Sequence, residues 1–149
     1  MTAPRAHSGP LGSARVRIAP SAPRFQRRVQ QNVAMGHVVA FANQKGGVAK
    51  TTTVVTVAAA LAELGRRVLV VDLDSQGCAT FCLGFDPEDL SATIADAILG
   101  ETKRSIGDVV LTAPDGVDLV PASLDLARAD QALATTMGRE YVLREALEP

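Results

Sequence analysis

The hydrophobic pattern of the chain becomes regular after about residue 35. Residues 37–43 (HVVAFAN) and residues 67–72 (RVLVVD) are short apolar runs. Such runs, without polar alternation, are typical of strands buried on both faces of a parallel sheet. Residues 51–64 lie between them and place apolar side chains at helical spacing, which predicts an amphipathic helix. The order strand, loop, helix, strand predicts a βαβ unit with a right-handed crossover.

The predicted helix over 51–64 has a clear end but a weak beginning. Its first half, residues 51–57, is rich in β-branched side chains, which have poor helix propensity. We therefore expect burial and a bound ligand to help hold it. Gly65 suits the left-handed position just after a helix, and Arg66 and Arg67 would lie at the negative end of the helix dipole.

Further elements are predicted downstream. Ser91 is a candidate N-cap for a helix over 91–99 that Gly100 would end. A turn at 114–116 (PDG) separates two further strands and is followed by two helical stretches. We expect those strands at 109–112 and 117–120, and those helices at 124–133 and 139–147.

Residues 1–34 form a basic arm that differs from the rest of the chain. They contain six Arg and no acidic residue, a charge of +6, which leaves −7 for the remainder because the whole chain is −1. The arm has four of the eight prolines and no hydrophobic period, which favours disorder. It could instead contact nucleic acid phosphates, act as a transit peptide, or result from a start assigned upstream of Met35. We expect one folded domain at 35–149.

Composition excludes several classes of protein. Hydrophobic residues make up 47% of the chain, which is sufficient for a core. No stretch approaches the roughly 20 apolar residues that span a bilayer, and no secretory signal is present. Cys78 and Cys82 are too few for a disulfide framework, so we expect reduced thiols. These features predict a cytoplasmic protein without a membrane partner.

The strongest chemical signal is the loop between the first strand and its helix. Small residues let successive backbone N–H groups surround an anion, and the following helix N-terminus adds partial positive charge. In the pattern G-x-x-x-x-G-K-[ST], the lysine contacts the β- and γ-phosphates and the hydroxyl coordinates Mg²⁺. Here Gln44 and Ala49 occupy the two glycine positions. We predict that ATP binds at Lys45, Gly46, Gly47, Val48, Ala49, Lys50, Thr51 and Thr52.

Ala49 affects how well this loop is formed. A negative φ at this position would cost the alanine little. A left-handed conformation would cost about 1–2 kcal/mol.

Three segments together resemble the ParA/Soj partition ATPases, within the class that includes MinD and the nitrogenase iron protein. Residues 43–53 (NQKGGVAKTTT) resemble the deviant Walker A motif of that family. Residues 71–80 (VDLDSQGCAT) resemble its switch I segment, with Ser75 and Cys78 in place of the usual Pro and Asn, and residues 121–127 (PASLDLA) resemble a third stretch. The resemblance covers residues 36–147 and implies a P-loop fold.

The resemblance also implies roles for individual residues. Lys45 matches the signature lysine that reaches the phosphates of a partner in an ATP-bound dimer. Asp74 matches the aspartate that positions the attacking water. Thr51 would ligate Mg²⁺ directly, and Asp72 would lie near the metal, in its outer shell. For Asp72 a purely structural strand-end cap is the alternative.

One element of the family's fold has no counterpart in the sequence. The Walker B strand reads roughly as apolar residues followed by D-C/T-P-P, and nothing in residues 81–149 matches it. We therefore expect an α/β fold with a P-loop NTPase-type parallel sheet flanked by helices, truncated before the Walker B strand. Hydrolysis of ATP by this chain alone is expected to be weak or absent.

The resemblance implies an ATPase, or a fragment of one, for chromosome or plasmid partitioning in the cytoplasm, associated with the nucleoid. Its cofactors would be ATP and Mg²⁺. Its partners would be a second copy of itself, a ParB-type centromere-binding protein and nonspecific DNA. Two alternatives stay open: a non-catalytic nucleotide-binding or interaction remnant, and a MinD-like site regulator.

Overall fold

A small mixed sheet forms the centre of the computed structural model, which describes residues 36–99 and 104–148. Its strands are β1 (Leu69–Val71), β2 (Leu111–Thr112) and β3 (Asp118–Val120), in the order β1-β3-β2. β1 pairs with β3 in parallel, with Val70 opposite Leu119. β2 pairs with β3 in the antiparallel direction. The predicted α/β class is confirmed, with one antiparallel pair added to the parallel one.

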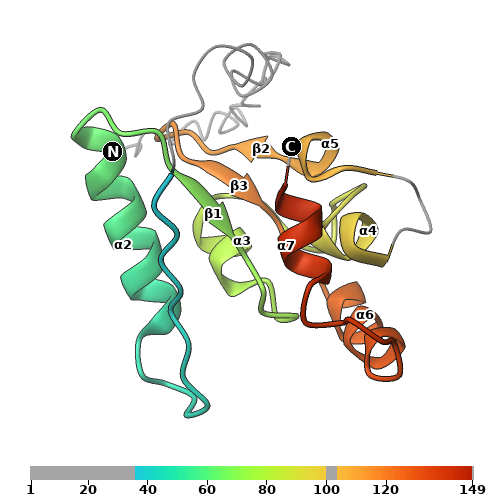
Figure 1. Cartoon of the computed structure of the whole chain (residues 1–149). Coiled ribbons are helices and arrows are strands. Elements are labelled where there is room, and N and C mark those ends of the chain that lie inside the picture. Colours follow the sequence, from blue (N-terminus) through green and yellow to red (C-terminus); the bar gives the residue numbers. More distant parts are fainter. Residues whose placement is uncertain (1–35, 100–103, 149) are drawn as a thin grey trace, which may run out of the picture.

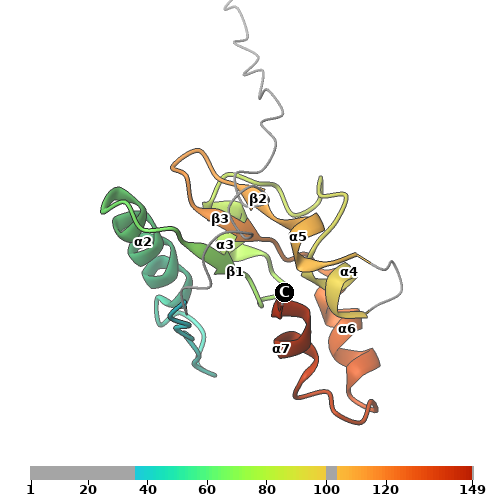
Figure 2. The same cartoon turned by 45° about the horizontal axis from the view of Figure 1, so that its top comes forward.

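Helices cover both faces of this sheet (Figures 1 and 2). One face carries α2 (Lys50–Glu63) and α3 (Cys78–Cys82), and its core includes Val70 and Leu119. The other face carries α4 (Ile94–Leu99), α5 (Ile106–Val109), α6 (Asp125–Leu133) and α7 (Val142–Leu147), and its core includes Val120. Adjacent residues of β3 thus face opposite cores, as the two-residue repeat of a strand requires.

Most of the predicted elements are present. The helix predicted at 51–64 is α2, the strand at 67–72 contains β1, and the strand at 117–120 contains β3. α6 and α7 correspond to the two closing helices. Gly65 has a φ of 74° and donates its N–H to the Ala62 carbonyl at 2.9 Å, so the predicted helix end is confirmed. The turn at 114–116 is confirmed by a φ of 81° at Gly116.

The predicted first strand is wrong for the chain as it folds here. Residues 37–43 form no strand and are exposed, with Val38 at 93% and Val39 at 70% of full exposure. A strand is stable only when its backbone groups are paired in a ladder. β1 pairs with β3, and among the described residues no strand pairs with its other edge. The expected βαβ pairing between 37–43 and 67–72 is therefore not formed.

Two boundaries near α4 and α5 also differ from the prediction. α4 begins at Ile94, so Ser91 is not its N-cap. Val109, expected in a strand, ends α5, which begins after Ser105. The Ser105 N–H and hydroxyl donate to Asp108 Oδ2 at 2.8 and 2.7 Å, and these two bonds hold the pKa of Asp108 below its ordinary range. This local pairing favours a helical turn where the apolar pattern alone indicated a strand.

The described helices include none that is long and apolar enough to cross a membrane. The basic arm predicted at 1–34, Met35 and the predicted helix stop at Gly100 lie outside the described residues.

Candidate phosphate-binding site

The loop over residues 45–52 joins the extended segment 36–43 to α2. Asn43 Oδ1 accepts a hydrogen bond from the Lys45 N–H at 2.9 Å, which turns the chain into the loop. Gly47 has a φ of 71°, and Ala49 has a φ of 59°. Left-handed residues that alternate with ordinary ones point successive N–H groups toward a common centre, the arrangement that binds anions. A Cβ placed on Gly46 or Gly47 would meet no atom within 4 Å, so the loop leaves open space beside its backbone.

Ala49 adopts the costly one of the two conformations considered from the sequence. It is the one non-glycine residue with positive φ in the described chain, and it is the N-cap of α2. The left-handed region brings an alanine Cβ close to the following carbonyl, at a cost of about 1–2 kcal/mol. The loop therefore stores strain directly beside the predicted phosphate position.

The first turn of α2 presents free donors. The Thr53 hydroxyl and N–H both donate to the Ala49 carbonyl, at 2.8 and 2.9 Å, so this threonine is occupied in closing the turn. Within the described residues the hydroxyls of Thr51 and Thr52 make no hydrogen bond. The first turn contains no acidic residue. The N-terminus of this 14-residue helix therefore keeps its positive end uncompensated.

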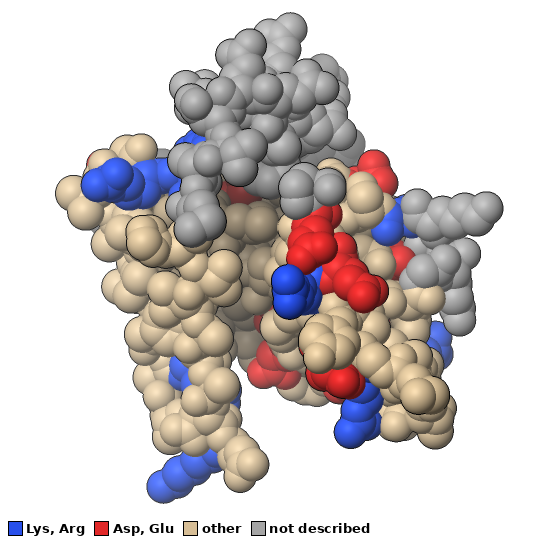
Figure 3. Space-filling view, viewed as in Figure 1, with Lys and Arg blue, Asp and Glu red and all other residues tan. Residues whose placement is uncertain are grey.

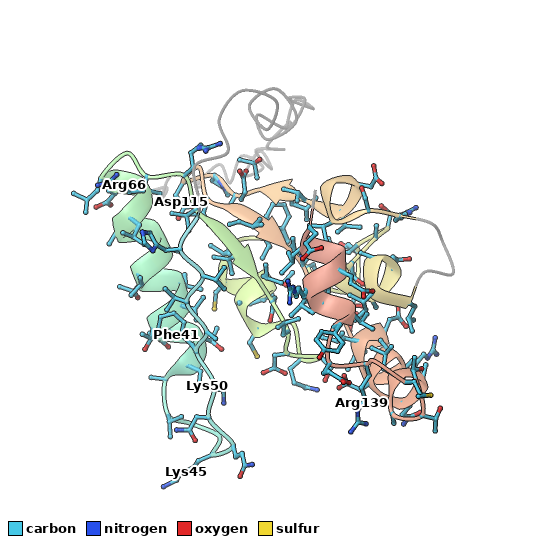
Figure 4. All side chains as sticks on the ribbon, viewed as in Figure 1. Phe41, Lys45, Lys50, Arg66, Asp115 and Arg139 are labelled. Carbon is cyan, nitrogen blue, oxygen red and sulfur yellow. The ribbon has the colours of Figure 1, made fainter. Side chains whose placement is uncertain are left out.

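The two lysines of the loop are placed differently. Lys50 is half-buried in the first turn of α2, whereas Lys45 is exposed. In Figure 4 Lys45 lies at the tip of the loop and extends away from the body of the molecule, while Lys50 lies beside the helix. The space-filling view shows basic side chains at both ends of the α2 column and most of the visible acidic side chains over the α7 side (Figure 3).

The loop after β1 is organised around Asp72, which is 4% exposed. Asp72 Oδ1 accepts the N–H of Asp74 at 3.1 Å. Its Oδ2 accepts both the N–H and the hydroxyl of Thr80, at 2.9 and 2.8 Å. These three bonds are what a structural strand-end cap requires. Carboxylate oxygens have further lone pairs, so the bonds leave room for an outer-shell interaction with a metal.

Asp74 lies on the exposed side of the same loop. Its Oδ1 accepts the N–H of Gln76 at 3.0 Å, and its carbonyl accepts the N–H of Gly77 at 2.8 Å. Gly77 is the N-cap of α3 and has a φ of 60°. A Cβ at Gly77 would lie 2.7 Å from Pro87 Cγ and 3.0 Å from the Ala122 carbonyl oxygen. Glycine is therefore required here by both conformation and space.

Only some of the predicted site residues come together. The loop before α2 and the loop after β1 lie at the same, lower end of the molecule in Figure 1. Among the described residues, however, no hydrogen bond or ion pair joins residues 45–52 to Asp72 or Asp74. No group of three or more His, Cys, Asp and Glu side chains there forms a metal site. The predicted catalytic and metal roles stay predictions.

Sequence reasoning assigned no role to Thr80. It is fully buried and joins the loop after β1 to the segment after β3, because its hydroxyl also accepts the Ala122 N–H at 3.0 Å. Its place at the end of the 71–80 segment was a usable signal: a threonine there can bond back to the carboxylate that ends the strand.

Comparison with known proteins gives a consistent result. Residues 36–149 match the model of a family described as an AAA domain. The sporulation initiation inhibitor protein Soj of Bacillus subtilis is 44% identical over 114 residues, which are 76% of this chain and 45% of Soj. The chromosome partitioning protein ParA of Caulobacter vibrioides is 42% identical over 111 residues, 74% of this chain and 41% of ParA. The chain thus spans less than half the length of these relatives.

A solved structure supports the same fold. Cobyrinic acid a,c-diamide synthase from Mycobacterium smegmatis, with a bound ATP analog and magnesium, is similar with a TM-score of 0.68 and 51% sequence identity. The similarity covers 71% of this chain and 43% of that one.

Proposed function

The chain belongs to the AAA domain family and, within it, to the ParA/Soj partition ATPases, and from this premise we propose that residues 45–52 bind ATP with Mg²⁺. The observation that carries the proposal is the loop geometry: left-handed residues at 47 and 49, open space beside Gly46 and Gly47, and an uncompensated helix N-terminus. These features together favour an anion that carries several negative charges.

Different groups of the loop bind different parts of the nucleotide in this proposal. Backbone N–H groups from Gly46 to Thr52 hold phosphate oxygens, and the Lys50 ammonium neutralises the β- and γ-phosphates. The Thr51 hydroxyl, which makes no hydrogen bond within the described residues, would be the direct magnesium ligand, and Asp72 would lie in the outer shell of the metal. A bound Mg²⁺ ion would supply charge neutralisation at the phosphates.

Lys45 and Asp74 have the exposure that their proposed roles require. Lys45 extends away from the body and is free to meet the phosphates held by a second copy of the chain (Figure 4). Asp74 is exposed and uses Oδ1 for the Gln76 N–H, which leaves Oδ2 to orient a water molecule. We assign these two residues to closure of an ATP-bound dimer and to hydrolysis.

At the level of the whole protein, the proposal is an ATP-driven partitioning factor in the cytoplasm. It would dimerise with ATP, associate with nonspecific DNA on the nucleoid and respond to a ParB-type partner. Two relatives support this proposal: the sporulation initiation inhibitor protein Soj, which is 44% identical, and the chromosome partitioning protein ParA, which is 42% identical.

A second candidate arises from the solved relative, a cobyrinic acid a,c-diamide synthase that is 51% identical to this chain. The two candidates share the nucleotide site and differ in what stimulates turnover. ATP consumption that rises with duplex DNA would support partitioning. ATP consumption that rises with cobyrinic acid and an ammonia donor would support amide synthesis.

Isothermal titration of the chain with MgATP tests the binding proposal. Lys50→Ala removes a charge-assisted contact with phosphate and should weaken binding roughly 10- to 100-fold. Lys45→Ala removes the same charge from the exposed tip and should leave binding to one chain within about threefold. Circular dichroism would establish that both variants fold.

Two results would count against the proposal. A folded wild-type chain that binds no MgATP would contradict it directly. Equal affinity in the wild type and in Lys50→Ala would place the nucleotide outside this loop.

A further inference from the structure

Thr80 is a wholly buried polar residue with all of its hydrogen-bonding groups in use. Its N–H and hydroxyl both donate to Asp72 Oδ2, at 2.9 and 2.8 Å, and the hydroxyl oxygen accepts the N–H of Ala122 at 3.0 Å. A hydroxyl can donate and accept at once, which a carboxylate or an ammonium cannot. The hydroxyl of Ser or Thr therefore suits this position.

The hydroxyl joins two loops that are far apart in sequence. Thr80 and Ala122 are 42 residues apart. β1 and β3 are parallel, so the segments after them leave the sheet at the same edge. The Asp72 N–H donates to the Val120 carbonyl at 3.0 Å and extends the ladder by one residue. Beyond the end of this ladder, the hydrogen bond between the Thr80 hydroxyl and the Ala122 N–H connects the two segments.

A second, independent observation places the same two segments close together. A Cβ added to Gly77 would lie 3.0 Å from the carbonyl oxygen of Ala122 and 2.7 Å from Pro87 Cγ. The loop therefore lies close to Ala122 on its carbonyl side as well as at its N–H. Ala122 itself is 0% exposed, so this contact surface is fixed in the core.

We propose that Thr80 is a positioning residue: its hydroxyl fastens the loop 72–80 to the Ala122 backbone and thereby fixes where Asp74 is presented. The function of Asp74 in this statement rests on the proposed function. The positional claim itself rests on the hydrogen bonds of Thr80 alone. Without the hydroxyl, the buried Ala122 N–H has no partner, and Asp72 loses one of its three donors.

Amide hydrogen exchange on the whole chain, without nucleotide, tests the claim. Thr80→Val keeps the shape and removes the hydroxyl, and it should raise exchange of the Gln76 and Gly77 amides at least about tenfold relative to β1 and β3. Thr80→Ser restores the hydroxyl and should return exchange to within about twofold of the wild type. Thr112→Val is the matched control, because the exposed Thr112 hydroxyl also donates to a carboxylate, that of Asp118, at 2.8 Å.

Unchanged exchange at Gln76 and Gly77 in Thr80→Val would overturn the proposal, as would a Thr80→Ser variant that behaves like Thr80→Val. If Thr80→Val does not fold, an NMR measurement on the wild type still tests the hydrogen bond between Thr80 and Ala122. A slowly exchanging Thr80 hydroxyl proton with a nuclear Overhauser contact to the Ala122 amide is expected, and its absence in the folded chain would refute the bond.

A titration with MgATP separates this inference from the proposed function. Thr80→Val leaves the phosphate loop untouched and Asp72 with two of its three donors, so it should bind MgATP with nearly the affinity of the wild type. A tenfold loss of affinity would make Thr80 part of the binding site and overturn a purely positioning role. A wild type that binds no MgATP would refute the proposed function, while the exchange result would still decide the role of Thr80.

Discussion

Two loops at the same end of the molecule, residues 45–52 and residues 72–80, are built in opposite ways. The first is held by short-range contacts: Asn43 with Lys45, and Thr53 with Ala49. The second is held by Asp72 and Thr80, whose bonds reach 8 and 42 residues along the chain. One loop is open and strained at Ala49, and the other is buried and fully bonded at its base.

This difference indicates which loop becomes ordered when a ligand binds and which loop is already fixed without one. An open loop with left-handed residues and free N–H groups gains its missing interactions when an anion binds. A loop whose polar atoms are already paired inside the core changes little, and it can hold an exposed side chain such as Asp74 at a fixed place. Substitutions should therefore affect stability far more in the second loop than in the first.

Asp72→Ala should have the largest effect on stability. It leaves the N–H of Asp74 and both donors of Thr80 without an acceptor, and we expect a loss of about 3–4 kcal/mol. Urea denaturation measures it. Asp118→Ala is the control, because Asp118 accepts only the exposed Thr112 hydroxyl among the described bonds and should cost about 1 kcal/mol or less. Equal losses would show that Asp72 has no special structural role.

Replacing one glycine in each loop compares the two directly. Gly77→Ala adds both a left-handed penalty and a clash with Pro87 and the Ala122 carbonyl, and should cost about 2–3 kcal/mol. Gly47→Ala adds the left-handed penalty alone, because its surroundings are open, and should cost about 1 kcal/mol. Thermal unfolding of both variants checks the order, and a larger cost at Gly47 would contradict the description of the open loop.

Ala49→Gly should give the smallest change, and in the opposite direction. Glycine relieves the left-handed strain at the N-cap of α2, and we expect a gain of about 1 kcal/mol in unfolding free energy. Ala60→Gly, at an exposed position inside the same helix, should instead lose roughly 0.5–1 kcal/mol. Loss of stability in Ala49→Gly would mean that the loop is not strained at this residue.

Local pattern was sufficient for α2, its end at Gly65 and the turn at Gly116, because spacing and glycine conformation determine these features. It was insufficient for residues 37–43, which satisfy every local criterion of a buried strand. A strand also needs a neighbour to pair with, and no property of the run itself reveals whether the neighbour is present. Val38 and Val39 therefore stay exposed despite their apolar character.

The candidate site likewise has features that local sequence predicts and features that depend on distant partners. The sequence alone predicts the phosphate loop, because glycine, lysine and threonine at fixed spacing define that motif without help from the rest of the fold. It did not reveal the bond between Thr80 and Ala122, which depends on β1 and β3 being adjacent and parallel. Such long-range polar contacts follow from topology, which is known only after the strands are paired.

Amide hydrogen exchange of the wild-type chain with and without MgATP tests the contrast between the loops most directly. The account predicts rapid exchange over residues 45–52 that slows at least about tenfold when MgATP is added. Over the same experiment the Thr80 and Ala122 amides should be protected before nucleotide is added and change by less than about twofold. Slow exchange of residues 45–52 without nucleotide, or no slowing when MgATP is added, would contradict the account.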